Sequence, residues 1–425
     1  MNICIFEDDM YRNFFPLTYL RACFDLRCGI FKLRQKIAYF FSNCTISYLI
    51  REELVPYYKY RFPDRNFNYI LEGDTLFING RVLFDSTIHN EIISLEKGAL
   101  KNKNEIIALR TNIVKSQKFT FSNLKEQIKD MDSHLIKDTK ISLINYLWEF
   151  ISNNCNEIEK DFHRLVGKRR NHILRHADIK SYFINEKAIF IGKDVIINVG
   201  TIFDAKQGPI FIDDNAEIMA NSTIIGPVYI GKHSKIKVGA KIYEGTSIGN
   251  LCKVGGEVEE TIIQAYSNKQ HDGFLGHSYL GEWVNIGADT NNSDLKNTYK
   301  NVKVYFYPQN RKIDSGSKFV GLIMGDHSKC GINSMFNTGC VVGIGCNLYS
   351  AELITDFIPS FSWGTANNLV EYKFDKFLET AKIVKSRRNL QILPPEKILL
   401  ENIWKETKYL RKKILTTESQ IHSVR

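Results

Sequence analysis

A six-residue period runs through the middle of this sequence and limits the folds that it can adopt. From residue 212 to residue 254, a branched aliphatic side chain recurs at every sixth position, in the order Ile212, Ile218, Ile224, Ile230, Ile236, Ile242, Ile248 and Val254. An α-helix repeats every 3.6 residues and a strand every two, so neither accounts for this spacing. Hexapeptide repeats are typical of a parallel β-helix, and we expect that fold here.

The geometry of such a coil predicts how the repeat is arranged. Three six-residue segments complete one turn of a triangular prism, so residues 18 apart should stack and residues six apart should lie on different faces. The period resumes at Phe274, Leu280 and Ile286, and again from Met324 to Leu348. Between these stretches, residues 289–318 have no repeat and are rich in polar side chains. We interpret them as a loop, and long loops on rigid scaffolds often carry function.

The segments on either side of the repeat have other patterns. Residues 1–175 alternate short apolar segments with helical periodicity, which predicts an α/β, Rossmann-like unit with a partly parallel sheet. We expect strands at residues 1–6, 45–50 and 67–71, a helical apolar stripe from Leu26 to Phe40, and a long helix over 143–165. After residue 365 the pattern is helical again, with Pro394 in a first turn. The predicted domains are an α/β unit (1–175), a β-helix (183–365) and a helical cap (366–425).

Composition excludes several classes of protein. The chain has 425 residues, 44% of them hydrophobic and 24% charged, which is enough for more than one cored domain. No stretch reaches the roughly 18 consecutive apolar residues of a membrane helix, and no secretory signal is recognisable at the start. The nine cysteines are odd in number and form no C-x-x-C pair, so neither a disulfide framework nor a zinc ribbon is indicated. We therefore expect a cytoplasmic protein with no membrane partner.

The formal charge of +10 is concentrated near the C-terminus. Residues 366–425 hold 13 Lys/Arg against 7 Asp/Glu, a net of +6. Such an excess is typical of a solvated helix face, and it leaves open the attraction of small anionic ligands. We expect no nucleic-acid partner.

Histidine is the side chain best suited to take a proton from an amine at neutral pH. His271 lies in a polar, glycine-containing segment, Asn268 to Gly276, where the backbone of a coil corner can admit a ligand. His277 follows six residues later and should point about a third of a turn away, so one subunit cannot use both in one site. A histidine on the surface of a solenoid is more often a bystander than a base.

Two further groups of polar residues are candidates for ligand binding. The loop contains Asn291, Asn292, Asp294, Lys296 and Tyr299, whose donors and acceptors suit a sugar or a phosphate, although such runs also form ordinary turns. Near the N-terminus, arginines follow the first expected strand, where α/β units bind phosphate. These arginines are Arg12, Arg21, Arg27 and Arg34, of which Arg34 is equally explained as a helix-surface residue.

Long runs of residues carry a resemblance to a known family. They include Phe15 to Thr18 with Asp25 to Gly29, Trp148-Glu149 through Asp161-Phe162, Gly239 to Tyr243, Tyr266 to Gly276, Gly281 to Lys296, and Met324 to Asn333. The chain resembles the bifunctional enzymes that join a uridyltransferase domain to a left-handed β-helix acetyltransferase domain and make UDP-N-acetylglucosamine. It looks most like a divergent bacterial group of sugar nucleotidyltransferases with the same two-part layout.

The resemblance implies roles for particular residues. The family's His-x-x-Tyr-Leu-Gly motif matches His271 to Gly276, with Phe274 in place of tyrosine, and implies a base at His271 and a substrate contact at position 274. Its Asn-Ile-Gly-Ala-Gly-Thr motif matches Asn285 to Thr290 and implies a substrate contact at Asn285. It further implies acetyl-CoA or another acyl-CoA beside Ala288 and Ile332, and a homotrimer with its sites between subunits.

The chain departs from the family at both sites. An Asn-Tyr pair in the family's loop is replaced by Asp294-Leu295, so the sugar or acyl group can differ. The glycine-rich nucleotide loop is replaced by residues 7–12, of which Arg12 is in place. The Asn-Gly-Asp metal motif corresponds to Asn79-Gly80-Arg81, where a cation replaces a carboxylate that binds Mg²⁺, and we expect Asn79 and Arg81 to contact nucleotide or phosphate. Any Mg²⁺ in the N-terminal unit would then depend on Asp8, Asp9 or Asp74, and the metal ligands stay undefined.

The sequence thus predicts a transferase of sugar-nucleotide metabolism. The leading hypothesis is transfer of an acyl group from acyl-CoA to an amino sugar or sugar phosphate by the β-helix, joined to a sugar-1-phosphate nucleotidyltransferase-like domain that binds a nucleotide or sugar phosphate. One alternative is an active bifunctional diphosphorylase, with Mg²⁺ in the N-terminal domain. Another is a catalytically silent sugar-nucleotide-binding scaffold.

Overall fold

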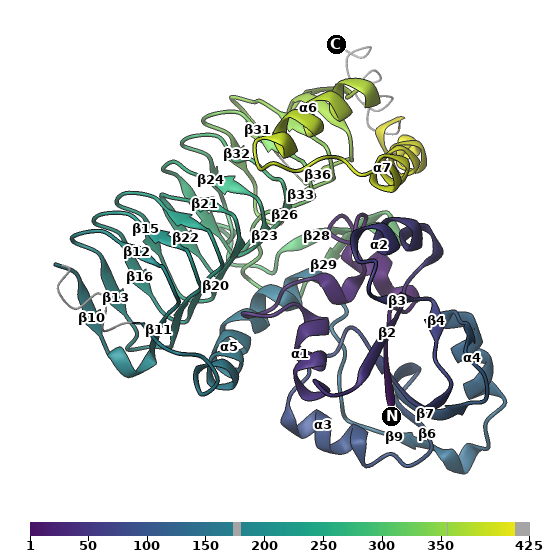
Figure 1. The fold of residues 1–425 in the computed structure, drawn as a ribbon. Coiled ribbons are helices and arrows are strands. Elements are labelled where there is room, and N and C mark those ends of the chain that lie inside the picture. The colour runs from purple at the N-terminus through teal and green to yellow at the C-terminus, as the bar shows by residue number, and fades with distance from the viewer. Residues whose placement is uncertain (173–179, 355, 413–425) are drawn as a thin grey trace.

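The computed structural model describes residues 1–172, 180–354 and 356–412. An α/β unit lies beside a long stack of β-coils, and two helices lie at the C-terminal end of the stack (Figure 1). The predicted boundary at residue 175 and the last part of the predicted cap, 413–425, fall outside the described residues. Among the described helices, none has the length and apolar character needed to cross a membrane.

A seven-stranded mixed sheet forms the N-terminal unit, in the order β3-β2-β1-β5-β7-β6-β9. β1 (Asn2–Phe6) pairs in parallel with β2 (Thr45–Leu49) and β5 (Gly73–Asn79), so the predicted α/β fold is confirmed. The remaining strands are β3 (Asn66–Phe67), β6 (Gly98–Asn102), β7 (Glu105–Ile113) and β9 (Ile136–Asp138), with β4 (Tyr69–Ile70) and β8 (Gln117–Lys118) as a separate pair. The helices are α1 (Leu33–Phe40), α2 (Val55–Arg61), α3 (Ser86–Ile93), α4 (Phe121–Lys129) and α5 (Leu147–Val166).

The helix expected from Leu26 to Phe40 is shorter than predicted. Only α1 is helical, and the preceding residues form a tight loop. Gly29 in this loop has φ +79°, and a β-carbon there would lie 2.6 Å from the carbonyl oxygen of Glu157. The loop therefore depends on glycine in a left-handed conformation and on close contact with α5. The apolar spacing was misleading because these side chains are buried by a loop and not by one helical face.

Short parallel strands stack on three faces and form the predicted left-handed β-helix. One face contains β10 (Tyr182–Ile184), β13 (Ile202–Asp204), β16 (Thr223–Ile225), β19 (Lys241–Ile242), β22 (Glu257–Glu259) and β25 (Phe274–Gly276), continued by β27 (Asn291–Asn292), β32 (Met335–Phe336) and β35 (Leu353–Ile354). The second contains β11 (Ile189–Ile191), β14 (Ile210–Ile212), β17 (Val228–Ile230), β20 (Thr246–Asn250), β23 (Ile262–Ala265), β26 (Tyr279–Glu282), β30 (Ile323–Met324), β33 (Val341–Val342) and β36 (Phe357–Ile358).

The third face carries the candidate site described below. It contains β12 (Ile196–Ile197), β15 (Glu217–Ile218), β18 (Lys235–Ile236), β21 (Lys253–Val254) and β24 (Asn268–Lys269), then β31 (Lys329–Cys330), β34 (Asn347–Leu348) and β37 (Ser362–Thr365). Asn285 bridges β24 and β31, so the two groups of strands form one continuous face. β38 (Asn368–Glu371) pairs antiparallel with β37 and ends the parallel stack on this face.

The six-residue repeat correctly predicted which side chains from 212 to 248 face the interior of the stack. Ile212 pairs with Ile230 and Ile230 with Ile248, as expected for residues 18 apart, and all three are fully buried. The register fails at Phe274, because Leu275 is the residue that pairs with Val258 and points inward. Coils in this part of the stack are shorter than 18 residues, so the phase of the repeat shifts.

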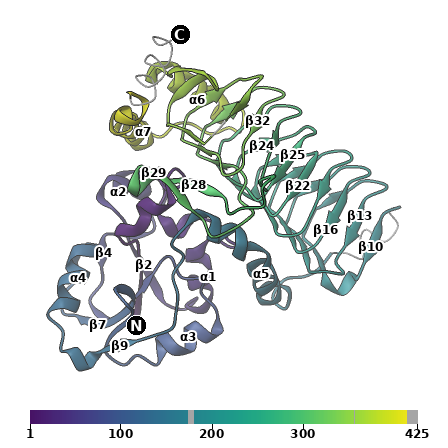
Figure 2. The same cartoon turned by 180° about the vertical axis from the view of Figure 1, so that it is seen from behind.

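Part of the polar insertion, residues 289–318, forms regular strands. Within it, β27 continues the stack, and β28 (Lys303–Phe306) and β29 (Arg311–Asp314) form an antiparallel hairpin that projects toward the N-terminal unit (Figure 2). Tyr307 at the hairpin end makes edge contacts with the stacked rings of Phe15 and Tyr19. The hairpin therefore connects the β-helix to the N-terminal unit.

The two C-terminal helices have different neighbours. α6 (Phe374–Ser386) leads back over the third face, where Arg388 just beyond it lies 3.3 Å from the side chain of Asn268. α7 (Pro394–Glu406) begins with proline, as predicted, and packs against α2 of the N-terminal unit. The helices thus cover a side of the β-helix as well as its end.

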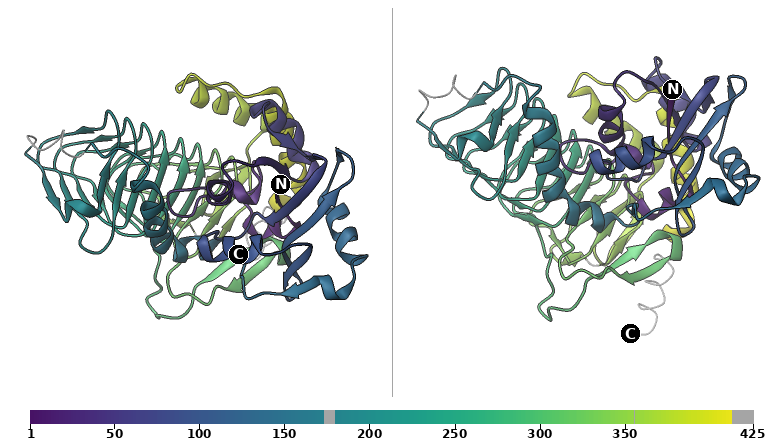
Figure 3. Two further views of the ribbon diagram at one scale, coloured as in Figure 1. Left: turned by 60° about the horizontal axis from the view of Figure 1, so that its bottom comes forward. Right: turned by 90° about the horizontal axis from the view of Figure 1, so that it is seen from below.

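Charged and polar contacts fix the N-terminal unit against the β-helix, with α5 lying alongside the coils (Figure 3). The Arg21 guanidinium is buried 2.9 Å from Asp326 and 3.6 Å from Glu282. The backbone N–H of Arg27 donates to the Tyr279 hydroxyl at 2.8 Å, and that hydroxyl donates to the Arg27 carbonyl oxygen at 2.9 Å. These contacts give the two halves a common, water-excluded junction.

Replacing Arg21 with methionine tests this junction. The substitution leaves Asp326 buried without its cation and Glu282 with only Lys32, 3.9 Å away. Breaking a buried pair in this way costs about 3–5 kcal/mol of unfolding free energy. We expect the urea midpoint of Arg21→Met to fall clearly below that of the natural chain. Lys125→Met is the control, because its pair with Asp9 is exposed and such pairs contribute less than about 1 kcal/mol. Equal midpoints for the two variants would contradict the proposed role of the junction.

Candidate functional site

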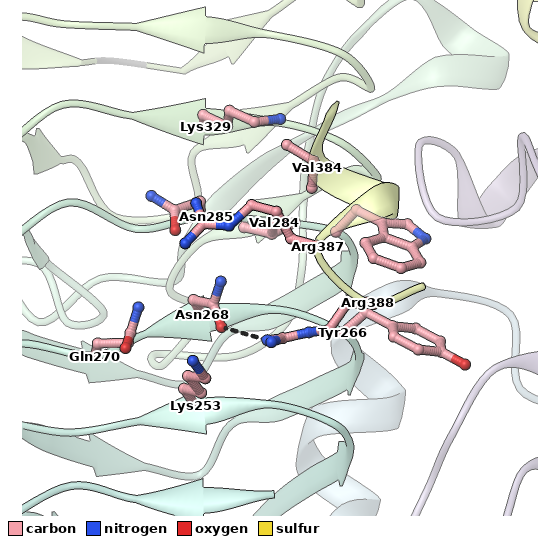
Figure 4. Close-up of a pocket in the computed structure, with 11 residues that line it drawn as sticks. Lys253, Tyr266, Asn268, Gln270, Val284, Asn285, Lys329, Val384, Arg387 and Arg388 are labelled. Carbon is pink, nitrogen blue, oxygen red and sulfur yellow. Dashed lines mark hydrogen bonds between the residues drawn. The ribbon is translucent and has the colours of Figure 1, made fainter. Parts of the chain in front are cut away.

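A polar cavity of about 280 Å³ lies between the third face of the β-helix and the C-terminal end of α6. Figure 4 shows side chains from successive coils pointing into it, with Arg387 and Arg388 entering from the helix side. The full lining is Lys253, Tyr266, Asn268, Gln270, Trp283, Val284, Asn285, Lys329, Val384, Arg387 and Arg388. Parallel stacking creates this arrangement, because each coil adds its outward residues directly above those of the previous one.

The lining is strongly basic. It includes four cationic side chains, Lys253, Lys329, Arg387 and Arg388, and no carboxylate among the residues that line it. Burial lowers the pKa of Lys329 to about 8, because desolvation disfavours the ammonium form. Its Nζ donates to the carbonyl oxygen of His327 at 2.9 Å. The cavity therefore suits an anion, and phosphate or sulfate is the simplest ligand of this kind.

The wall of the cavity offers an aromatic surface and amides. The rings of Tyr266 and Trp283 stack with centroids 4.4 Å apart. Asn285, predicted to contact substrate, lines the cavity and is half-buried, together with Gln270. Amides beside a cationic site can hydrogen-bond the hydroxyl groups of a sugar.

His271 directly follows the cavity residue Gln270 at the next corner of the coil, and it is exposed. Lys269 Nζ donates to the His271 carbonyl oxygen at 2.9 Å, which fixes the backbone of this corner. Burial lowers the pKa of Lys269 to about 8. His271 therefore lies one residue beyond the lining of the cationic cavity.

The His277 imidazole is held by two side-chain contacts. Its Nδ1 lies 2.8 Å from Oδ2 of Asp294, and its ring stacks on Phe319 with a centroid distance of 4.9 Å. Glu259 is close enough for its charge to interact with His277, and burial raises the pKa of Glu259. A carboxylate on Nδ1 fixes the tautomer and leaves Nε2 available as a base.

The structure brings several predicted loop residues to the histidine-bearing coil. The side-chain oxygens of Asn291 and Asn292 accept hydrogen bonds from the backbone N–H groups of Phe274 and Gly276, at 2.8 and 2.9 Å. Asn292 is buried and also donates to the Gly276 carbonyl oxygen. These amides therefore hold the segment between the two histidines. Phe274 itself is half-buried.

Other predicted positions lie farther along the same loop and corner. Lys296 donates to the carbonyl oxygen of Asn301 at 2.8 Å, and Tyr299 is exposed. Ala288 and Ile332 occupy adjacent coil corners, joined by a hydrogen bond from the Asn333 N–H to the Ala288 carbonyl oxygen. Ile332 is 69% exposed, so this corner presents an apolar surface to solvent.

In the N-terminal unit, Asn79 and Arg81 come together with Asp8 at the carboxyl ends of β1 and β5. Arg81 is fully buried, with Nη2 2.7 Å from Asp8 and 3.0 Å from Glu105. The Asn79 side chain donates to Asp8 at 2.9 Å and accepts from the Arg81 N–H at 3.0 Å. This cluster is a compact network in which one guanidinium pairs with two carboxylates.

The predicted phosphate-binding arginines are dispersed. Arg12 is exposed and its Nε donates to the Tyr11 hydroxyl at 3.2 Å. Arg21 lies in the junction described above, and Arg27 is buried with its guanidinium 5.0 Å from the centre of the Tyr229 ring. Arg34 pairs with Asp25 at 2.6 Å. Their assignment to phosphate remains a prediction.

The carboxylates that could hold Mg²⁺ in the N-terminal unit are already paired with cations. Asp8 pairs with Arg81, Asp9 with Lys125 at 2.9 Å, and Asp74 with Arg110 at 2.8 Å. Asp74 is also at the opposite end of β5 from Asn79, roughly 16 Å away at strand spacing. No cluster of three or more metal-ligating side chains occurs in residues 1–172, 180–354 and 356–412. Of these pairs, only that of Asp8 with Arg81 is buried, and beside that guanidinium the residues present do not fit a divalent cation.

The fold defines the class of protein: a nucleotidyl transferase-like α/β unit joined to a left-handed β-helix. Residues 3–170 match the family model described as Sugar nucleotidyl transferase. Bifunctional protein GlmU from Methanococcus aeolicus is 26% identical over 367 residues, covering 75% of this chain and 78% of that protein. The chain is thus similar to GlmU proteins over most of its length, and residues 3–170 match the nucleotidyl transferase model.

Two further relatives match over shorter segments. Bifunctional protein GlmU from Synechococcus sp. is 27% identical over 222 residues, covering 48% of this chain and 44% of that protein. The bifunctional sugar-1-phosphate nucleotidylyltransferase/acetyltransferase from Sulfurisphaera tokodaii is 32% identical over 161 residues, covering 37% and 40%. The match thus spans less than half the length of these two relatives.

Sequence reasoning missed the cationic part of the cavity. Lys253 and Lys329 belong to the repeat, where a lysine looks like any outward-facing residue. Arg387 and Arg388 belong to the basic C-terminal excess, which had two open interpretations. The charge count indicated a basic C-terminal segment. Only the return of α6 over the third face shows which of its arginines line the same cavity as the lysines of the coils.

The depressed pKa of Lys329 predicts how anion binding depends on pH. Below about pH 8 its ammonium contributes to binding, and above about pH 8 this charge is lost. A charge-assisted hydrogen bond contributes about 1.5–3 kcal/mol, so sulfate affinity should fall roughly five- to tenfold between pH 7 and pH 9. Sulfate does not titrate in this range, and calorimetry can measure its affinity.

Two variants separate Lys329 from the other cations. Lys329→Arg should bind sulfate equally well at both pH values, because guanidinium keeps its charge. Lys329→Met should bind weakly at both. A natural chain whose sulfate affinity is the same at pH 7 and pH 9 would contradict the role of this lysine.

Proposed function

We propose that this protein transfers an acyl group from acyl-CoA to the amine of an amino-sugar phosphate. The observation that carries the proposal is the cationic cavity on the β-helix face, next to the corner that bears His271. In this proposal the sugar phosphate places its phosphate among Lys253, Lys329 and the α6 arginines. Asn285 and Gln270 hydrogen-bond its hydroxyl groups. The names of the relatives, which include acetyltransferase, agree with this function.

The chemistry requires one base and one leaving group. The amine nitrogen attacks the thioester carbonyl, a C–N bond forms, the C–S bond breaks, and CoA leaves as a thiol. His271 takes the proton from the attacking amine and returns it to the leaving sulfur. Acyl-CoA runs along the exposed corner formed by Ala288 and Ile332. Phe274 packs against the sugar or the acyl group, and Lys296, Tyr299 and the loop amides complete the mouth of the site.

A second candidate base rests on one specific contact. His277 is held by Asp294 at 2.8 Å, the arrangement expected of an oriented imidazole, whereas His271 directly follows the cavity residue Gln270. In the proposal, His271 is the base and the His277–Asp294 pair positions the coil that carries it.

Asparagine substitutions distinguish the two histidines. We expect His271→Asn to lower kcat for thiol release from acetyl-CoA with a hexosamine phosphate by about 10²–10⁴-fold, the usual contribution of a general base. His277→Asn should have a smaller effect. His233→Asn is the control, because His233 is exposed at a left-handed position that asparagine tolerates, and its rate should not change.

The opposite ranking would assign the base to His277. No thiol release from the natural chain with any hexosamine phosphate would reject the acyltransferase proposal itself. A homotrimer belongs to the same proposal, since sites between subunits would bring a second copy to the exposed corner at Ile332.

The diphosphorylase alternative concerns the N-terminal unit. The relative from Sulfurisphaera tokodaii carries nucleotidylyltransferase in its name, and the family model covers this unit. Pyrophosphate release from UTP or dTTP with a sugar 1-phosphate would support the alternative, whereas ligand binding without turnover in either assay would support the silent scaffold.

A further inference from the structure

The strand order of the N-terminal sheet marks one place for a ligand. β2 and β3 lie on one side of β1, and β5 and the later strands lie on the other. In open α/β sheets, ligands bind outside the carboxyl ends of the strands at such a change of direction. Here Phe6 pairs with Asn79, so the chain leaving β1 at Asp8 and the chain leaving β5 at Arg81 lie side by side.

The Arg81 guanidinium lies against Asp8 at this place, and Asp8 also lines a neighbouring cavity of about 150 Å³. The Nε of Arg81 lies 3.0 and 3.1 Å from the two oxygens of Asp8, and its Nη2 is 2.7 Å from one of them. Its Nη1 donates to the Ile144 carbonyl oxygen at 2.8 Å and to the Asn145 side chain at 2.6 Å. The arginine is among the largest fully buried side chains of the described chain.

The carboxylates around the guanidinium are already engaged in ion pairs and hydrogen bonds. Both oxygens of Asp8 accept from Arg81, and one also accepts from Asn79. Glu105 adds a further contact to Arg81 at 3.0 Å. Glu7, the next acidic side chain, accepts from the Cys23 N–H at 2.7 Å and pairs with Arg51. Mg²⁺ needs about six oxygen ligands at roughly 2.1 Å and tolerates little distortion.

The position of Arg81 is also unsuitable for a nearby metal. A divalent cation at Asp8 would lie against a guanidinium that cannot lose its proton. Two positive charges a few ångströms apart in a buried site repel strongly, because the surroundings screen them less than water does. Either the metal or the arginine can occupy the space beside Asp8, and the sequence supplies the arginine.

We propose that the Arg81 guanidinium supplies the positive charge beside Asp8 that a divalent metal would otherwise supply. The N-terminal unit then binds no Mg²⁺ at the ends of β1 and β5. The unit then carries out no metal-dependent nucleotidyl transfer at this place. It remains a nucleotidyl transferase-like body that is fixed to the β-helix through Arg21 and Arg27. This inference is independent of acyl transfer, which concerns a cavity on the other half.

Manganese titration of the full chain tests the proposal without an activity assay. Free Mn²⁺ is counted by its electron paramagnetic resonance signal, without nucleotide, for the natural chain and for Arg81→Asp. The natural chain sets the baseline, to which no site at Asp8 should contribute. Arg81→Asp removes the guanidinium and places a carboxylate beside Asp8 and Glu105, so it should gain one saturable site.

Arg110→Asp is the matched control, because it makes the same change beside Asp74 at the other end of β5, on a partly exposed pair. It should gain no saturable site. A folded Arg81→Asp chain that binds no more Mn²⁺ than Arg110→Asp would overturn the assignment of Arg81.

The natural chain decides the question even where Arg81→Asp fails to fold. Crystals soaked in Mn²⁺ locate any bound ion by anomalous scattering. An ion coordinated by Asp8 would overturn the proposal. The absence of an ion at Asp8, or ions only at other carboxylates, would support it.

Discussion

The structure depends on charges that are removed from water where its two halves meet. Arg21 reaches from the N-terminal unit to two carboxylates of the β-helix. Glu282 is at the end of β26 on the second face, and Asp326 is at the corner that follows β30. A buried charge without a partner costs far more than an exposed one, so this pair is formed only when both halves are folded and in contact. The backbone of Arg27 forms two hydrogen bonds with the Tyr279 hydroxyl, and these bonds fix the position of the N-terminal unit along the β-helix.

This junction links the N-terminal unit to the candidate site. Glu282 immediately precedes Trp283, which forms the aromatic wall of the cationic cavity with Tyr266. On the other side of the cavity, α6 and α7 form a second connection, because Lys385 pairs with Glu396 at 2.6 Å and α7 packs on α2. The cavity is therefore enclosed by elements from the β-helix and the C-terminus, and both are anchored to the N-terminal unit.

Much of the fold was predictable because it follows from short-range pattern. The six-residue repeat gave the β-helix and its inward isoleucines, and the apolar segments gave β1 and β2. The helix expected from Leu26 to Phe40 was wrong in its first half, where contact with α5 overrides local spacing. Within the site, Asn285 was identified through motif resemblance, whereas Arg387 and Arg388 required the return of a distant helix. Pairings such as Arg81 with Asp8 join residues far apart in the chain, and no local pattern reveals them.

The central claim is that the β-helix, and not the end of the N-terminal sheet, holds the reacting sugar phosphate. The most direct measurement is a crystal structure of the full chain with a hexosamine 1-phosphate and CoA. The account predicts electron density for the sugar phosphate in the cavity lined by Lys329, Arg387 and Arg388, with its amine facing the corner at His271. Density for the sugar phosphate beside Asp8 and Arg81, with the cationic cavity free of ligand, would contradict it.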